Sequence, residues 1–270
     1  MRSATERAYR YDLYIVPVWR EPFDQMVEKH LPLPKQGSIL EVNSGTGGLA
    51  LDLAMKMRER GDVVATDPSP ERLALARAKA AIKKVSNLTF LEKEPTGLGL
   101  DDDAYALVIG DATLGEQNSL GQMLAEMARV CQPGGTVSLK LLTHGSFDEV
   151  FSVLWEALCD CHLLDYAAHV ERLATDLPTV SDVEQLFARL GLENAHCFVE
   201  RREFVFDQAK DFFESPLVED YFFDSWFGFL PSESLRQRVF RRVLALINRE
   251  RRHSYFDVSI KAALAIGRKR

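Results

Sequence analysis

The sequence has 270 residues, of which 46% are hydrophobic and 27% charged, with a formal net charge of −7 at pH 7. The hydrophobic content supports a substantial core, and the acidic balance argues against nucleic-acid binding, for which a protein normally presents a basic face. Four cysteines in a chain of this length do not form a disulfide framework. No apolar run approaches the roughly 18 residues that cross a bilayer, and residues 1–7 do not lead into a signal-peptide core. We therefore expect a soluble, cytoplasmic protein.

The N-terminal segment from Tyr9 to Arg20 is rich in aromatic residues and precedes the first predicted strand. We expect it to be helical. Its aromatic side chains have two interpretations that the sequence leaves open, because they can dock the helix on a sheet or face a ligand. Tyr11 and Tyr14 are the candidates for the second role.

A glycine-rich turn follows the first apolar run. Residues 38–42 are predicted to form a buried strand that carries Glu41 near its end, and residues 49–54 show the pattern of a helix. Between them, Gly45 and Gly47 permit positive φ and a close approach of the backbone to a ligand, while the start of the helix offers free N–H groups to an anion. Such turns also occur in α/β proteins that bind no nucleotide, so the turn alone is weak support for a nucleotide site.

A second apolar run, residues 62–67, ends in Asp67 and precedes a helix that begins with proline. Asp67 lies 22 positions after Gly45 (67 minus 45), close to the offset of about 20 at which an acid reaches a ribose in doubly wound folds. This spacing is also compatible with a nicotinamide cofactor.

The stretch from Asn87 to Leu142 distinguishes a nicotinamide cofactor from other nucleotide-like cofactors. It contains a third strand at 87–91, a fourth at 105–109, a helix at 123–130, and a Pro-Gly-Gly turn at 133–135 that opens a fifth strand. In this order the segments resemble the class I S-adenosylmethionine-dependent methyltransferases, and the resemblance covers roughly residues 36–143. It implies a Rossmann-like, doubly wound α/β fold with a mostly parallel seven-stranded sheet, and S-adenosylmethionine as cofactor, released as S-adenosylhomocysteine.

Carried over to this sequence, the resemblance places Gly45 and Gly47 against the methionine part of the cofactor, Asp67 on the ribose hydroxyls and Glu94 on the adenine amino group. The positive sulfonium suits a site with several acids. The full set of cofactor-binding residues predicted in this way is Glu41, Asn43, Ser44, Gly45, Gly47, Asp67, Pro68, Glu94, Pro95 and Asp111.

Two residues depart from the family pattern. Asn43 stands where the family usually has glycine, and Ala106 stands where it has aspartate. Asparagine tolerates left-handed backbone geometry better than other non-glycine residues, so Asn43 can keep the turn while its side chain crowds or hydrogen-bonds the ligand. These departures leave two alternatives open, an active methyltransferase and a cofactor-binding or scaffold relative that has lost turnover.

The second half of the chain holds two predicted strands, residues 197–205 and 256–266, and a helix from Pro178 in which Ser181 is expected as N-cap. Cys159 and Cys161 have the wrong spacing for a zinc knuckle, so we predict no metal. Arginines at 236, 238, 241, 242, 249, 251 and 252 suggest an amphipathic helix with a solvated basic face rather than an RNA or membrane patch.

Eight aromatic residues fall between positions 212 and 229. They can form a core, a homodimer seam or the wall of an apolar substrate pocket. They lie in a helical insert that we place at about 208–250, before the last strand. We divide the chain into an N-terminal helical cap, residues 1–35, and a Rossmann-like methyltransferase domain, residues 36–270.

Methyl transfer from a sulfonium requires alignment of the acceptor and, for some acceptors, a base. Asp111 and His144 follow the fourth and fifth strands, where open α/β sheets bind ligands, and Tyr14 is the third catalytic candidate. The Asn-Pro-Pro-Tyr signature of amino-group methylation is absent after the fourth strand, where the chain reads Gly110-Asp111-Ala112-Thr113. We therefore predict methyl transfer to oxygen or carbon of a small, hydrophobic acceptor.

Overall fold

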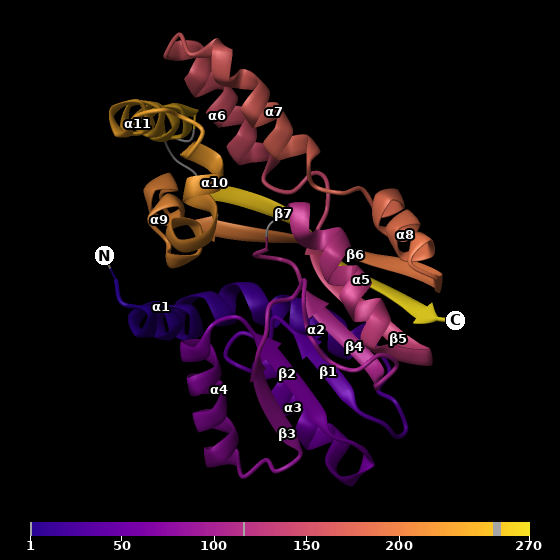
Figure 1. Ribbon diagram of the computed structural model, residues 1–270. Helices are drawn as coiled ribbons and strands as arrows, with labels where there is room; N and C mark the ends of the chain where they lie inside the picture. Colours follow the sequence, from indigo (N-terminus) through magenta and orange to yellow (C-terminus); the bar gives the residue numbers. More distant parts are fainter. Residues whose placement is uncertain (1, 116, 251–254) are drawn as a thin grey trace. The chain divides into compact units, whose positions relative to one another are not determined.

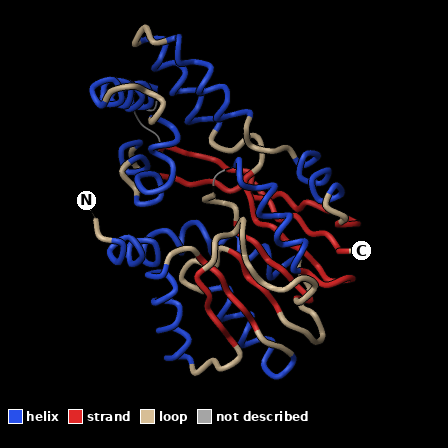
Figure 2. Tube along the Cα trace, viewed as in Figure 1, coloured by secondary structure: helices blue, strands red, loops and turns tan. Residues whose placement is uncertain are grey.

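Seven strands form one sheet, in the order β3-β2-β1-β4-β5-β7-β6, in the computed structural model, which describes residues 2–115, 117–250 and 255–270 (Figures 1 and 2). Strands β1 to β5 are joined by parallel pairings. Helices connect them, and the α/β fold with a seven-stranded sheet is as predicted. The strands are β1 (Ile39–Val42), β2 (Val63–Asp67), β3 (Leu88–Glu92), β4 (Tyr105–Asp111), β5 (Cys131–Leu142), β6 (Leu192–Phe206) and β7 (Phe256–Lys269).

The chain folds as two compact units. The first consists of Met1–Leu141, Val180–Phe198 and Ala263–Arg270, so the N-terminal helices belong to the same unit as the first five strands. The second consists of Leu142–Thr179 and Val199–Ala262, and therefore takes in more of the chain than the insert predicted at 208–250.

The first helix of the first unit, α1 (Ala4–Arg10), has an N-terminal cap. The Ser3 hydroxyl accepts from the Glu6 N–H, and the Glu6 carboxylate accepts from the Ser3 N–H, which is a capping box. A π-helix, η1, follows directly. The helices and short turns are α1 (Ala4–Arg10), η1 (Tyr11–Arg20), α2 (Glu21–His30), α3 (Gly48–Met57), η2 (Arg58–Arg60), α4 (Pro70–Lys83), η3 (Gln117–Ser119), α5 (Leu120–Val130) and α8 (Val180–Arg189).

The sheet reverses its winding between β1 and β4. β1 pairs with β2 on one side and with β4 on the other, so the connections lead away from this point in opposite directions. Open α/β sheets bind ligands at such a switch point, outside the carboxyl ends of the strands. Val42 aligns with Gly110, and Asp111 aligns with Lys140 on β5. This register brings the turn after β1 next to the end of β4.

Two local predictions need correction. Ser181 is not the N-cap, because α8 begins at Val180 and the Ser181 hydroxyl instead accepts from the Gln185 side chain one turn later. The Pro-Gly-Gly segment does not precede β5 but lies within it. Tyr105 aligns with Cys131 and Leu107 with Thr136, so the intervening residues of β5 bulge out, with Gly134 at φ 75°.

The second unit has an aromatic core. Phe212, Phe213, Trp226 and Phe227 are all buried, and the Trp226 ring lies edge-on to Phe147 at 5.1 Å between centroids. Four of the eight aromatics predicted as core, seam or pocket wall are therefore core. The helices and short turns of this unit are α6 (Asp148–Asp160), η4 (Leu164–Tyr166), α7 (Ala167–Thr175), α9 (Ala209–Phe213), η5 (Val218–Phe222), α10 (Phe223–Phe227) and α11 (Glu233–Glu250).

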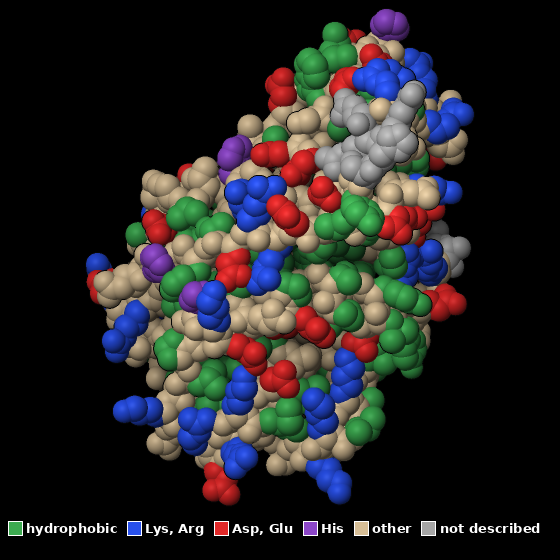
Figure 3. Space-filling model, turned by 180° about the vertical axis from the view of Figure 1, so that it is seen from behind, with side chains coloured by type: hydrophobic (Ala, Val, Ile, Leu, Met, Phe, Trp, Pro, Cys, Tyr) green, Lys and Arg blue, Asp and Glu red, His purple; other side chains and the backbone are tan. Residues whose placement is uncertain are grey.

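Helix α11 is amphipathic, as predicted, because Val239, Val243, Leu246 and Ile247 are buried while Arg238, Arg241 and Arg249 are exposed. Arg242 pairs with Asp160 (Nε to Oδ2, 2.7 Å), Arg238 donates to the Cys161 carbonyl oxygen, and Arg249 pairs with Glu156 at 3.1 Å. These contacts connect α11 to α6 and the residue after it, so these three arginines have partners within the second unit. Arg251 and Arg252 lie outside the described residues. On the face shown in Figure 3, acidic and basic side chains are interspersed.

Candidate functional site

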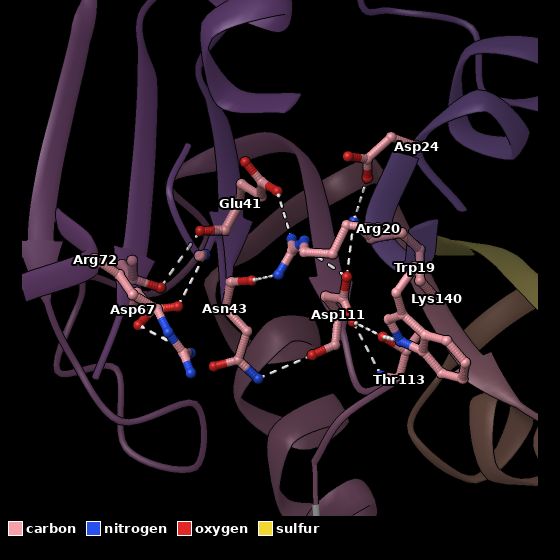
Figure 4. Close-up of polar contacts among 12 residues, drawn as sticks. Trp19, Arg20, Asp24, Glu41, Asn43, Asp67, Arg72, Asp111, Thr113 and Lys140 are labelled. Carbon is pink, nitrogen blue, oxygen red and sulfur yellow. Dashed lines mark hydrogen bonds and ion pairs between the residues drawn. The ribbon is translucent and has the colours of Figure 1, made fainter. Parts of the chain in front are cut away.

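The turn between β1 and α3 is held open by three residues in left-handed conformation. Asn43 has φ 59°, Gly45 has φ 59° and Gly47 has φ 76°. Asn43 therefore keeps the backbone geometry expected of a glycine at its position. Its side-chain amide donates to the Asp111 carbonyl oxygen at 2.9 Å, which joins the turn to the end of β4 (Figure 4).

Asp67 lies at the end of β2 and is almost completely buried. Its Oδ2 accepts from the Gly45 N–H at 2.8 Å, its Oδ1 accepts from the Ser69 N–H at 2.9 Å, and the Arg72 guanidinium lies 3.7 Å from Oδ1. Burial raises the pKa of Asp67, against the lowering effect of Arg72 and the two N–H groups. Asp67 thus anchors the glycine turn, and each carboxylate oxygen still has a lone pair for a further donor.

The π-helix η1 covers this turn. The Tyr11 hydroxyl reaches Gly45 so closely that a Cβ added there would lie 2.6 Å from it, and Arg72 stacks over the Tyr11 ring at 4.3 Å. Asp12 accepts from Thr46 on the turn and from Lys79 on α4. Such a long π-helix is unusual, and π-helical turns are frequent at functional sites.

A buried cluster of charges lies beside the turn (Figure 4). The Arg20 guanidinium lies 3.4 Å from Glu41 Oε1 and 3.2 Å from Asp111 Oδ2, and donates to the Asn43 carbonyl oxygen at 2.8 Å. The Lys140 ammonium is 3.0 Å from Asp111 Oδ2 and 2.6 Å from Asp24 Oδ1. The five charged residues come from η1, α2, β1, β4 and β5.

Two buried carboxyl groups of the cluster, those of Asp111 and Glu41, differ in the direction of their pKa shifts. Burial alone would raise the pKa of Asp111, but Arg20, Lys140 and the hydrogen bonds from Thr113 outweigh it and hold that pKa well below its ordinary value. Burial raises the pKa of Glu41 to about 7, because Lys140 and Arg20 compensate it only in part. Asp111 is therefore a fixed charge at neutral pH, whereas Glu41 titrates there.

The predicted residues fall into different surroundings. Glu94 follows β3, is exposed, and forms an isolated bridge with Gly97. Tyr14 lies on the exposed face of η1, with 58% of its surface accessible, while Tyr11 faces the turn. His144 belongs to the second unit, where its Nδ1 lies 3.0 Å from the Ala174 carbonyl oxygen. Pro68 and Pro95 follow β2 and β3 and are half-buried.

Sequence reasoning missed the two cations of the cluster. Arg20 ends the aromatic segment, in which only the tyrosines were considered as ligand contacts, and Lys140 is the single cation among the leucines at 139–142. A lysine in a predicted buried strand is the signal that could have found it, because a buried charge needs a counter-ion.

The site fits a ligand with polar groups. Among the residues that the structure describes, Glu41 Oε2 and Ser44 Oγ are buried without a hydrogen-bond partner. Glu41 lies near the end of β1, and Ser44 lies in the turn that follows it. Unpaired buried acceptors are costly, and a ligand with ammonium or hydroxyl donors would satisfy them.

Comparison with known proteins identifies this arrangement. Residues 39–135 match the family described as "Methyltransferase domain". Over 119 residues the chain is 33% identical to the demethylmenaquinone methyltransferase of Shouchella clausii, a match that covers 44% of this chain and 49% of that protein. Residues 39–135, about a third of the chain, therefore have the sequence pattern of a methyltransferase domain. The matched region spans about half the length of this relative.

Other relatives and solved structures agree with the methyltransferase fold. Methyltransferase GfsG of Streptomyces halstedii is 24% identical over 174 residues, which cover 61% of this chain and 62% of that one. The YcgJ protein of Bacillus subtilis superposes with a TM-score of 0.57 at 16% identity, over 93% of this chain and 99% of that one. A phosphoethanolamine N-methyltransferase of Haemonchus contortus, solved with S-adenosylhomocysteine, has a TM-score of 0.53 at 16% identity over 93% and 53% of the two chains.

The cofactor of methyltransferase domains of this kind is S-adenosylmethionine, and the residues of the site fit it. The unpaired oxygen of Glu41 and the Asp67 carboxylate offer acceptors to its ammonium and hydroxyl groups. Within the described residues, no helix is both long and apolar enough to cross a membrane, and no three His, Cys, Asp or Glu side chains are grouped to hold a metal ion.

Proposed function

We propose that this methyltransferase transfers the methyl group of S-adenosylmethionine to oxygen or carbon of a small, hydrophobic acceptor. The observation that supports cofactor binding most strongly is the group of buried acids around the glycine turn, in which Glu41 keeps an unpaired oxygen and Asp67 keeps acceptor capacity. In this proposal Asp67 accepts the ribose hydroxyls and Glu41 faces the cationic methionine end.

The apolar acceptor is supported by the outer face of α1 and η1. Tyr9, Leu13, Tyr14 and Val18 are between 49% and 62% exposed. Contiguous exposed apolar side chains on one helix face are unusual unless they contact a ligand or a partner. The relatives named demethylmenaquinone methyltransferases act, by their name, on an apolar quinone, which agrees with such an acceptor.

Asp111 is a poor proton acceptor, because its ion pairs with Arg20 and Lys140 keep it ionised and weakly basic. His144 is the better candidate for a base. When its Nδ1 carries the proton and donates to the Ala174 carbonyl oxygen, its Nε2 is left as an acceptor. Tyr14, exposed on η1, stays a candidate for contact with the acceptor.

Calorimetric titration with S-adenosylmethionine and S-adenosylhomocysteine tests the cofactor assignment. We expect micromolar binding of both, no competition by NADH, and a loss of affinity of at least tenfold in Asp67→Asn, which weakens the acceptor for the ribose hydroxyls. Asp62→Asn is the matched control, because Asp62 is exposed and immediately precedes β2, at the end opposite to Asp67. Equal affinity in Asp67→Asn and the control would refute the ribose assignment.

Transfer of a radiolabelled methyl group tests turnover. A panel of hydroxylated quinones and phenols, set against primary amines, distinguishes oxygen and carbon acceptors from nitrogen acceptors. His144→Gln is expected to lower kcat while cofactor affinity stays unchanged. Binding of both cofactor forms without transfer to any member of a broad panel would favour the alternative, a cofactor-binding or scaffold protein without turnover.

A further inference from the structure

Glu41 has a buried carboxylate with one oxygen occupied and one free. It is completely buried on β1, and its Oε1 lies 3.4 Å from the Arg20 guanidinium. Its Oε2 has no hydrogen-bond partner among the residues that the structure describes. A buried carboxylate in this state is stable only when it is protonated or when a further cation reaches it.

The groups that face Glu41 cannot supply that cation. They are Arg20 on η1, Asp24 on α2, Asp111 on β4 and Lys140 on β5. Lys140 lies 2.6 Å from Asp24 and 3.0 Å from Asp111, and Arg20 also pairs with Asp111. When Glu41 is ionised, two cations face three carboxylates, so the cluster lacks one positive charge.

We propose that Glu41 releases a proton to solvent when the cationic methionine end of S-adenosylmethionine binds, so that cofactor binding and proton release are coupled. The inference rests on the proposed function, because it needs the cofactor at this site. The Glu41 O–H bond breaks, the proton passes to water or buffer, and the carboxylate that remains gains the missing positive charge as its counter-ion. Nothing is oxidised or reduced.

The coupling has a definite pH range. Because the pKa of Glu41 in the free protein is raised to about 7, roughly 10% of the carboxyl groups are ionised at pH 6 and roughly 90% at pH 8. Cofactor affinity should therefore rise about tenfold between pH 6 and pH 8 and level off above. At pH 7 binding should release about half a proton per site, provided the pKa of Glu41 falls well below 7 in the complex.

Calorimetry in buffers of different ionisation enthalpy measures this release directly. S-adenosylmethionine carries an ammonium and a sulfonium, S-adenosylhomocysteine carries the ammonium alone, and 5′-methylthioadenosine carries neither. We expect release with S-adenosylmethionine and none with 5′-methylthioadenosine. Release with S-adenosylhomocysteine as well would assign the ammonium as the cation, and its absence would assign the sulfonium, and both results support the coupling.

Two variants separate Glu41 from other groups that titrate near neutrality. Glu41→Gln should bind with the same affinity at pH 6 and pH 8 and release no proton. Glu28→Gln is the control, because Glu28 pairs with Lys56 on the exposed surface and should leave both quantities unchanged. Should Glu41→Gln not fold, the three ligands tested on the wild-type protein still decide the question.

Cofactor binding and proton release can be measured separately. Binding of S-adenosylmethionine with pH-independent affinity and no proton release would overturn the coupling alone. Equal release with 5′-methylthioadenosine would also overturn it, since no cation is then involved. Absence of binding for both S-adenosylmethionine and S-adenosylhomocysteine would overturn the proposed function and the coupling together.

Discussion

Replacing Arg20 with methionine tests how strongly the charge cluster depends on the N-terminal helices. The Arg20 side chain is 7% exposed, donates to the Tyr11 hydroxyl at 2.9 Å and to the Asn43 carbonyl oxygen at 2.8 Å, and pairs with Asp111. Removing one partner of a buried ion pair costs about 3–5 kcal/mol, because the remaining charge stays buried without its counter-ion. Lys140 still lies 3.0 Å from Asp111, so we expect the lower end, about 3 kcal/mol.

Urea unfolding followed by circular dichroism at pH 7 measures this loss. The double variant Arg20→Met/Asp111→Asn should be more stable than Arg20→Met alone, since it removes the unpaired carboxylate as well. Arg270→Met is the control, because Arg270 forms an exposed pair with Glu193 that contributes little to stability. A change of less than about 1 kcal/mol in Arg20→Met would refute the reasoning, because the carboxylates would then be compensated without it.

Three further predictions follow from burial and close contact. Gly45→Ala should destabilise the N-terminal helices and speed tryptic cleavage there, because its Cβ would lie 2.6 Å from the Tyr11 hydroxyl at φ +59°; an unchanged cleavage rate would contradict this contact. Trp226→Ala should lower the free energy of unfolding by about 3–5 kcal/mol in urea titrations. A loss below about 1 kcal/mol would show that Trp226 is not part of the aromatic core. The pKa of Glu41 is raised to about 7, so its contribution to stability is present below about pH 4.5 and is lost as the pH rises through 7. Between pH 5 and pH 8 the wild type should therefore lose about 3 kcal/mol relative to Glu41→Gln, and parallel pH profiles would refute this.

The sequence predicted the fold well because the deciding signals are local. Buried parallel strands are continuous apolar runs, and each of the first four strands was placed within about two residues of its observed bounds. Asn43 was expected to adopt left-handed geometry, and its φ of 59° confirms this. The glycine turn and Asp67 were found for the same reason, since a strand, a turn and an acid at its end can be recognised from neighbouring residues.

The charge cluster was not predicted because its contacts are not local. Arg20 and Lys140 are far apart in the sequence and meet Asp111 only through the docking of η1 and the register between β4 and β5. The orientation of the tyrosines was also open. Tyr11 and Tyr14 are three positions apart, and a π-helix turns more widely than the α-helix assumed from the pattern.

The two departures from the family pattern have local packing roles that need no loss of function to explain them. The Asn43 side chain bonds the Asp111 carbonyl oxygen at 2.9 Å, which adds a link between β1 and β4 that a glycine would lack. Ala106 is buried, and its Cβ lies 2.8 Å from the position that a Cβ on Gly37 would take, so the larger aspartate would have to displace the turn before β1. Glu41 and Asp67, the two acids of the proposed cofactor site, are present in spite of both departures. Asn43→Gly should accordingly leave stability within about 1 kcal/mol of the wild type, since glycine has no steric penalty at positive φ and this relief offsets one lost hydrogen bond. A much larger loss in urea unfolding would mean that the link from Asn43 to Asp111 holds the edge of the site together.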